Sequence, residues 1–332
     1  MIELKKILCL TLSLILTLIS LSACGRTENN ASVDQKGEED TRENTSEDIS
    51  EAESETNASE SILTDTVYGK NSGTDATLTG FEPLPLVDFK VNDPDNTNSL
   101  STTKISHAYG VAKNETANDI SINNQKYFEN GQFDAITLDL KTDKKVVYLT
   151  FDVGYDNGYT DIILNTLKEK NVTAAFFCTV HEMKTSPDII TRMIKEGHIV
   201  GNHTENHPSM DEISRTEMMQ EIKAFDDYLR TNYGYSSPYF RFPKGEYSDC
   251  ALELVGSLGY TSVFWSLAYA DWDTENQKGA AYAHETVISR IHPGAIILLH
   301  AVSSDNAYAL GDIIDTARDM GYEFRSLDDY GI

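Results

Sequence analysis

The stretch Lys145–Thr160 reads KVVYLTFDVGYDNGYT, in which an apolar run ends at a single aspartate, Asp152, and continues directly into a glycine-containing loop. The run is apolar at consecutive positions, which is typical of a strand buried on both faces in a parallel sheet. A carboxylate at the end of such a strand lies where barrel enzymes place their active sites. The stretch therefore predicts both a fold and the edge of that fold at which a site would lie.

Six further apolar runs follow, separated by amphipathic segments. The runs are TAAFFCTV, HIVGNH, YFRFP, TSVFWSLA, AIILLHA and YEFRSL, and the segments include SPDIITRMIKEGH, SRTEMMQEIKAFDDYLRTNYG and ALGDIIDTARDMGY. Strands that alternate with helices indicate either an α/β barrel or an open doubly wound sheet. For residues 144–332 we predict a distorted (β/α) barrel of seven parallel strands.

The segments before this domain have different compositions. Residues 61–143 contain scattered aromatic residues without a recognisable period, so we expect an irregular N-terminal extension that packs on the domain. Residues 26–60 contain twelve acidic and three basic residues and almost nothing apolar. Such a segment cannot bury enough surface to offset its ordering entropy, so residues 25–60 are predicted to form a disordered acidic tether.

The first 24 residues have the pattern of a secretory signal. Lys5 and Lys6 precede a short apolar run, and the tetrad LSAC ends at Cys24. The tetrad resembles a bacterial lipobox, which implies that Cys24 is lipidated and anchors the chain to the extracytoplasmic face of the membrane. Diacylation would supply the two chains that a stable anchor needs. An ordinary cleaved signal that happens to contain a cysteine is the alternative.

The overall composition narrows the possible partners. With 53 acidic and 27 basic residues the formal charge is −26, so the chain is not suited to neutralise the phosphates of a nucleic acid. Cys178 and Cys250 follow the signal and are too few for a disulfide framework, so no essential bridge is expected.

Four of the apolar runs end in a titratable or cationic residue: Asp152, His203, Arg241 and His300. Each residue alone has a simple structural explanation, such as a helix cap or a satisfied core histidine. Four of them at the same end of the first, third, fourth and sixth predicted strands indicate an active site at the barrel mouth. His207 follows His203 at spacing i, i+4, which predicts two imidazoles on one side of a helical turn that share a divalent ion.

These residues carry a family resemblance. In chain order, TFDVG, HTENH, RFPKG and ILLH resemble the motifs of the polysaccharide deacetylase family, which is also called the NodB homology domain or carbohydrate esterase family four. The resemblance covers residues 145–329. YDNGYT, FWSLAYADW, NQKG and HPGAIILLHAVSSDNAYAL look most like the deacetylases of peptidoglycan N-acetylmuramic acid, whose activity leads to the muramic δ-lactam of the spore cortex.

The resemblance implies a metal-dependent hydrolysis of an N-acetyl group. His203 and His207 would hold the divalent ion, Zn²⁺ or alternatively Co²⁺, which polarises the acetyl carbonyl and acidifies a water molecule. Asp152 would be the general base and His300 the general acid. Arg241 would keep Asp152 ionised and correctly aimed.

Two positions depart from the family pattern. Val153 stands where the family has an aspartate as third metal ligand, so we expect a weakened metal site, with Asp156 as a candidate replacement. Ala268 stands where the family has the aspartate that tunes the acid histidine. Asp271 is the nearest carboxylate, and we predict that it supports His300.

Three residues are candidates for substrate binding. Lys244 lies next to the expected base and would pair with the lactyl carboxylate that distinguishes muramic acid from glucosamine; a solvated loop lysine is the alternative. Trp265 and Trp272 are predicted to line the sugar groove, although Trp265 fits a core position equally well.

Three functions remain open at this point. The first is a monomeric, lipid-anchored deacetylase of N-acetylmuramic acid in peptidoglycan glycan strands. The second is a deacetylase of N-acetylglucosamine in peptidoglycan or chitooligosaccharides, which would use the same chemistry. The third is a catalytically degenerate wall-binding lipoprotein that lost its metal site with the missing aspartate.

Overall fold

The structure is a computed structural model that describes residues 77–331. The predicted signal peptide with Cys24, the predicted tether at residues 25–60, residues 61–76 and Ile332 lie outside the described residues. In the described range, no helix has the length and apolar composition needed to cross a membrane.

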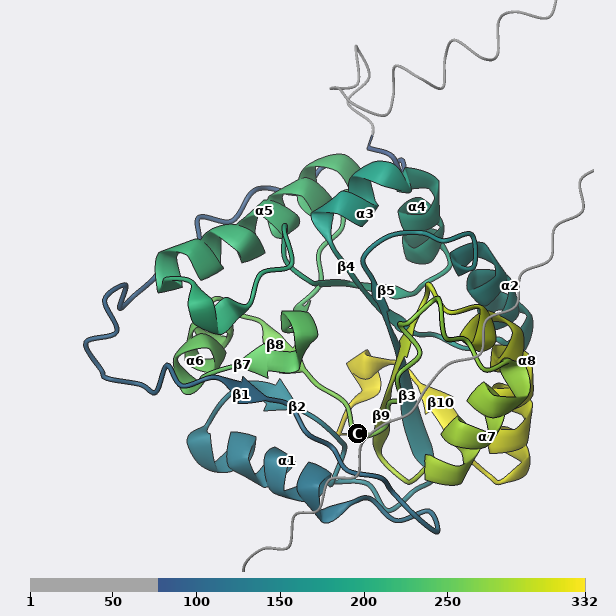
Figure 1. Cartoon of the computed structure of the whole chain (residues 1–332). Helices are drawn as coiled ribbons and strands as arrows, with labels where there is room; N and C mark the ends of the chain where they lie inside the picture. Colours follow the sequence, from purple (N-terminus) through teal and green to yellow (C-terminus); the bar gives the residue numbers. More distant parts are fainter. Residues whose placement is uncertain (1–76, 332) are drawn as a thin grey trace, which may run out of the picture. The chain divides into compact units, whose positions relative to one another are not determined.

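A curled parallel sheet forms the centre of the described chain (Figure 1). Its longest strand, β3 (Val146–Val153), pairs in parallel with β4 (Ala175–Cys178), β9 (Ala295–His300) and β10 (Glu323–Arg325). From β4 the sheet continues, always in parallel, through β5 (Ile199–Asn202), β6 (Tyr239–Phe240), β8 (Thr261–Val263) and β2 (Ala135–Ile136). A parallel bridge between Leu267 and Ile297 brings the segment after β8 against β9, so the sheet curls round towards closure.

The α/β class and the seven predicted parallel strands are confirmed. An eighth strand of this sheet, β2, comes from the segment before the regular pattern. Helices cover the outside of the sheet (Figure 1). They are α2 (Thr160–Lys170), α3 (Val180–Thr185), α4 (Pro187–Lys195), α5 (Arg215–Tyr233), α6 (Asp249–Ser257), α7 (Ala280–Arg290) and α8 (Ser304–Asp319).

The extension before residue 144 is more regular than predicted. It contains helix α1 (Asp119–Gly131), strand β2, and strand β1 (Ile105–Ser106), which pairs antiparallel with β7 (Glu246–Tyr247). The buried residues of α1 are Ser121, Gln125 and Phe128, of which two are polar. Because the helix buries so few apolar side chains, its sequence has no visible hydrophobic period, and the prediction of an irregular segment was wrong for this part.

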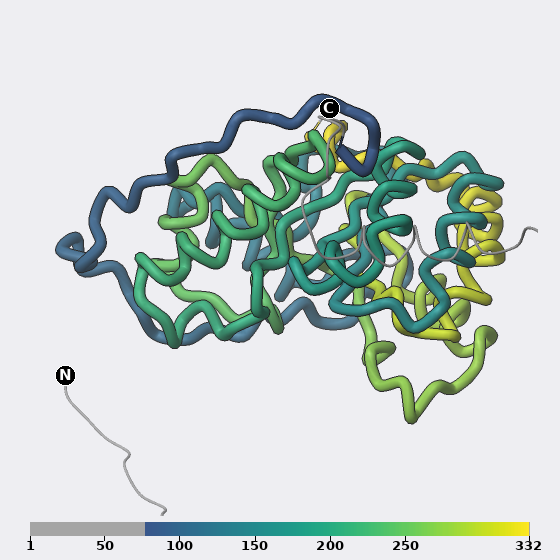
Figure 2. Tube along the Cα trace, turned by 90° about the horizontal axis from the view of Figure 1, so that it is seen from above, coloured from purple at the N-terminus to yellow at the C-terminus, as the bar shows by residue number. Residues whose placement is uncertain are grey.

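The first described residues do follow an irregular path. In Figure 2 the dark blue start of the described chain runs in an extended course along the outside of the green helices. Its main chain is held on the end of α5, where Leu78 N donates to Asn232 O at 2.7 Å and Leu84 N donates to Arg230 O at 3.1 Å.

The side chains of β3 alternate between two apolar clusters. Val147, Leu149, Phe151 and Val153 pack with the helices on the outer face of the sheet. Val146 and Tyr148 pack with the inner cluster inside the curl. Since side chains of a strand alternate between faces, Asp152 lies on the inner face and Val153 on the outer one.

Candidate active site

A cavity of about 660 Å³ opens at the carboxyl ends of the strands, inside the curl of the sheet. Most of the residues predicted for the site line it: Asp152, His203, His207, Lys244, Trp265, Trp272 and His300. The two others, Arg241 and Asp271, are buried directly behind this lining and contact Asp152 and His300. The structure therefore brings these nine predicted residues together, whereas Asp156, the candidate replacement ligand, does not line the cavity.

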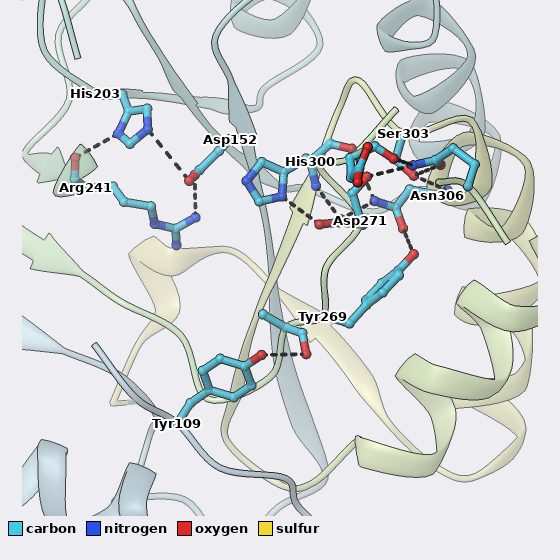
Figure 3. A network of polar contacts seen from close by, with 12 residues as sticks. Tyr109, Asp152, His203, Arg241, Tyr269, Asp271, His300, Ser303 and Asn306 are labelled. Carbon is cyan, nitrogen blue, oxygen red and sulfur yellow. Dashed lines mark hydrogen bonds and ion pairs between the residues drawn. The ribbon is translucent and has the colours of Figure 1, made fainter. Parts of the chain in front are cut away.

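Asp152 is held by a buried arginine (Figure 3). Arg241 Nη1 donates to Asp152 Oδ1 at 2.8 Å, and its Nε and Nη2 donate to Val263 O and Thr150 Oγ1, each at 2.9 Å. Burial by itself would raise the pKa of Asp152, but the nearby charge of Arg241, with further contributions from His203 and His300, holds that pKa below its ordinary value. Asp152 is thus an ionised, fixed carboxylate in the cavity wall.

His203 and His207 face one another beside this carboxylate, with their ring centroids 4.8 Å apart. His203 Nδ1 donates to Arg241 O at 2.8 Å, so the lone pair of Nε2 is free, and Nε2 lies 3.7 Å from Asp152 Oδ2. A main-chain acceptor on the far ring nitrogen is typical of metal-binding histidines.

The predicted helical turn between the two histidines is wrong. The segment is a loop in which Thr204 and His207 have left-handed φ angles of 71° and 57°. Asn202 Oδ1 accepts from Thr204 N at 2.9 Å, and Thr204 Oγ1 accepts from His207 N at 2.9 Å. These side-chain bonds replace helical ones, and the loop nevertheless brings both rings to one place.

The donor set fits a two-histidine metal site. Burial lowers the pKa of His203 to about 4 and also lowers that of His207, so both rings are neutral and able to coordinate a cation. Across residues 77–331, no three His, Cys, Asp or Glu side chains are grouped closely enough to hold a metal ion. Val153 packs in the outer apolar cluster, and Asp156 Oδ1 instead accepts from Thr160 Oγ1 at 2.8 Å and from Gly158 N at 3.1 Å.

His300 lies on the other side of Asp152 and is bound to Asp271 (Figure 3). Its Nδ1 donates to Asp271 Oδ1 at 2.7 Å, and its main-chain N donates to Asp271 Oδ2 at 2.8 Å. Burial disfavours the charged imidazolium, but Asp271 outweighs burial and the pKa of His300 is raised. This geometry supports the prediction that Asp271 serves His300.

The three candidates for substrate binding lie around the cavity. Lys244 has a left-handed φ of 59°, and its Nζ donates to Ser209 Oγ at 3.3 Å. Trp265 is only 8% exposed and belongs to the inner apolar cluster while also lining the cavity, so both of its predicted roles are compatible with the structure. Trp272 is 60% exposed at the cavity edge.

Sequence reasoning missed several contributors to the site, among them Tyr109 and Asn306. Tyr109, in the extension, lines the cavity and donates from its hydroxyl to Ala268 O at 3.1 Å. Asn306, in α8, donates to Asp271 Oδ2 at 2.5 Å. Tyr109 belongs to no motif, whereas Asn306 lies in the DNAYAL segment six positions after His300, which sequence similarity had singled out without assigning it a role.

Comparison with known proteins identifies the family. The profile of the polysaccharide deacetylase family matches residues 139–263. An uncharacterized 30.6 kDa protein of Geobacillus stearothermophilus is 51% identical over 187 residues, which cover 56% of this chain and 71% of that protein. The peptidoglycan-N-acetylmuramic acid deacetylase PdaA of Bacillus subtilis is 44% identical over 199 residues, which cover 60% of this chain and 75% of that one.

The fold leads to the same family. The solved structure of Bacillus subtilis PdaA, a family 4 carbohydrate esterase, superposes with a TM-score of 0.66 at 39% sequence identity, covering 70% of this chain and 98% of PdaA. The cavity at the strand ends, the paired histidines, the arginine-bound Asp152 and the aspartate-bound His300 all lie on the parallel-sheet fold of this chain. The chain belongs to the polysaccharide deacetylase family.

Proposed function

We propose that the protein hydrolyses the N-acetyl group of N-acetylmuramic acid in the glycan strands of peptidoglycan. The observation that carries this proposal is the placement of two titratable groups with opposite pKa shifts in one cavity. Asp152 is paired with the cation of Arg241 and has a lowered pKa, whereas His300 is paired with the carboxylate of Asp271 and has a raised pKa. Groups whose environments push their pKa values apart are suited to act as base and acid in the same reaction.

In the proposed reaction, Asp152 removes a proton from a water molecule as the water oxygen bonds to the acetyl carbonyl carbon. His300 then donates its Nε2 proton to the amide nitrogen as the C–N bond breaks, which releases acetate and leaves a free amine on the sugar. A divalent ion, Zn²⁺ or Co²⁺, held by His203 and His207 would supply Lewis-acid polarisation of the carbonyl. Arg241 keeps Asp152 ionised for its role.

Lys244 is the proposed selector for muramic acid. It lines the cavity beside His207, and its ammonium forms no ion pair with any described residue. The lactyl ether of muramic acid adds a carboxylate that glucosamine lacks, and an ammonium in a partly enclosed cavity is a suitable partner for it. Lys244→Ala should therefore raise KM for muramic substrates and leave glucosamine oligomers unaffected; an equal loss on both would contradict this role.

Mass spectrometry of muropeptides tests the activity. Purified full-length protein is incubated with peptide-free peptidoglycan glycan in the presence of Zn²⁺ or Co²⁺. Loss of one acetyl group from muramic acid, with or without δ-lactam formation, is the expected result. Loss from glucosamine instead would transfer the assignment to the other sugar, and no mass change with either metal would favour a wall-binding protein without activity.

We also propose that the protein acts as a monomer on the outer face of the membrane, anchored through a lipidated Cys24. The acidic segment at residues 25–60 would serve as a tether that lets the domain reach the cell wall, and the product would contribute to the spore cortex. Labelling with a radioactive fatty acid and membrane fractionation test the anchor. Cys24→Ser should abolish both the label and the membrane association, and retention of either would contradict the anchor.

A further inference from the structure

Asp271 binds Asn306 as well as His300, and Asn306 has no role in the reaction proposed above. Asn306, in the first turn of α8, is fully buried, and its Nδ2 donates to Asp271 Oδ2 at 2.5 Å and to His300 O at 3.2 Å. Its main-chain N donates to Ser303 Oγ at 3.2 Å, which fixes the residue at the start of the helix. On the far side, Asn306 Oδ1 accepts from Tyr269 Oη at 2.5 Å.

The chemistry of these groups permits one arrangement of the hydrogen bonds. A carboxylate accepts only, so the amide nitrogen of Asn306 must face Asp271 and its oxygen must face Tyr269. Tyr269 must then donate its proton, and burial, which raises the pKa of Tyr269, keeps that proton in place. The bonds therefore run in one direction, from Tyr269 through Asn306 to Asp271 (Figure 3).

The hydrogen bonds from Tyr269 to Asn306 and from Asn306 to Asp271 determine which carboxylate oxygen of Asp271 binds the imidazole of His300. Oδ2 accepts from the amide of Asn306 and from the main-chain N of His300, while Oδ1 accepts from the imidazole. With both oxygens engaged, the carboxylate cannot rotate about its Cβ–Cγ bond without losing hydrogen bonds inside a buried site, which is costly. His300 thereby keeps its Nδ1 proton on Asp271, and Nε2, the ring nitrogen towards Asp152, carries the proton that the imidazolium donates.

We propose that Asn306, oriented by Tyr269, is a positioning residue that fixes Asp271 so that His300 can deliver its proton to the leaving nitrogen. This inference rests on the proposed function and deepens it. Asn306 does not line the cavity, so it acts through Asp271 and His300. Its removal should impair the step in which the amine departs and leave substrate binding intact.

Two substrates with different leaving groups separate this role from general damage. The N-acetyl glycan releases an amine that must be protonated, whereas 4-nitrophenyl acetate releases a phenolate that needs no acid. For Asn306→Ala we expect kcat on the glycan to fall roughly tenfold or more with little change in KM. Turnover of 4-nitrophenyl acetate should stay within about twofold of wild type, the range of an ordinary substitution away from the acid. Asp152→Asn, which removes the base, should lose both activities.

Further variants distinguish a specific effect on the acid from an effect of misfolding. Asn306→Asp keeps the shape but places an oxygen against Asp271, so it should show the same selective loss without leaving a cavity. Tyr269→Phe should give a smaller loss of the same kind. Gln125→Ala removes a buried amide in α1, away from the cavity, and should change neither activity selectively.

The outcomes distinguish the two proposals. A wild-type protein that removes no acetyl group from any glycan contradicts the proposed function itself. If wild type is active, and Asn306→Ala and Asn306→Asp lose both substrates equally or lose neither, the positioning role of Asn306 is contradicted.

Discussion

At the scale of single residues, Asp271 sets the protonation of His300. The pKa of His300 is raised although burial opposes it, because Asp271 contributes both charge and a hydrogen bond and Asp152 adds to the effect, while Arg241 opposes it. The acid must be protonated to act, so activity is lost as the pH rises through this pKa. The alkaline limb of kcat/KM should therefore lie above the ordinary histidine value of 6.5.

Asp271→Asn should move that limb to lower pH, since the imidazolium loses its main stabilising charge. The pH profile of kcat/KM on the glycan measures this, and kcat should fall in the same variant. Asp305→Asn is the matched control, because Asp305 is also buried but binds the main chain at Lys278 and Gly279 instead of His300. An alkaline limb that stays in place in Asp271→Asn would show that another group controls the acid.

Glu182 is a buried carboxyl in α3 outside the cavity, and burial raises its pKa from 4.5 to about 7. The folded state thus binds this proton more tightly than the unfolded state. The stability that protonated Glu182 contributes is fully present below pH 4.5 and is lost as the pH rises through about 7. Over this range the free energy of unfolding falls by roughly 3 kcal/mol.

Glu182→Gln should therefore make the protein more stable than wild type at pH 8 and flatten the pH dependence between these two values. Urea unfolding at pH 4.5, 6 and 8 measures the effect. Glu169→Gln, at an exposed position of α2, is the control and should leave the curve unchanged. Equal stability of Glu182→Gln and wild type at pH 8 would mean that Glu182 is ionised without cost.

At the scale of elements, the antiparallel pair of β1 and β7 carries the extension to the cavity. His107 N donates to Gly245 O at 2.8 Å, and His107 Nε2 contacts Trp265 O at 2.8 Å. Tyr109 continues from this anchor into the cavity wall. The position of the Trp265 indole thus depends on close packing between two segments far apart in the sequence.

Gly245→Ala tests this packing. A Cβ at Gly245 would lie 2.7 Å from Trp265 Cη2 and 3.3 Å from His107 Cβ, at a φ of +66° that disfavours alanine. We expect a several-fold higher KM for the glycan and a loss of stability of about 1 kcal/mol or more. Gly259→Ala has a φ of +86° with nothing within 4 Å of its Cβ, so it should lose stability while keeping KM. The same KM in both variants would exclude a role for this contact in substrate binding.

The parts of the fold that could be predicted from the sequence are those whose burial is apolar and periodic. All seven runs from KVVYLTFD to YEFRSL form strands, and β3, β4, β5 and β9 are buried on both faces over almost their whole length, whereas β10 is only partly buried. Helix α1 could not be predicted, because it buries Ser121 and Gln125 through hydrogen bonds that leave no hydrophobic period.

The residues of the candidate site likewise divide into those that could be predicted from the sequence and those that could not. Asp152, His203, Arg241 and His300 were identified because strand ends converge, which is a property of topology. Tyr109 reaches the site through packing between segments far apart in the sequence, which no local pattern encodes. Asn306 lies six residues after His300, but its role depends on Asp271 and Tyr269, which are 35 and 37 positions away. The turn at Thr204 was predicted as helical because the spacing of two histidines does not reveal the side-chain bonds that shape the loop.

At the scale of the whole molecule, a metal ion held by His203 and His207 should stabilise the folded state. Both histidines lie in the loop after β5, and His203 donates to Arg241 O directly after β6, so the site exists only when the strands are assembled. A ligand that binds only the folded state adds about 2.7 kcal/mol when its concentration is 100 times Kd.

Zn²⁺ should accordingly raise the Tm of the protein by several degrees, and a chelator should reverse the rise. With two histidine ligands instead of the usual three protein ligands, the increase should need a higher Zn²⁺ concentration than a three-ligand site does. His203→Ala and His207→Ala should each remove the effect, while His284→Ala, at a histidine that contacts Thr316 between α7 and α8, should retain it. A Zn²⁺-dependent rise in Tm that survives both substitutions would place the ion elsewhere in the chain and leave the two histidines without a metal role.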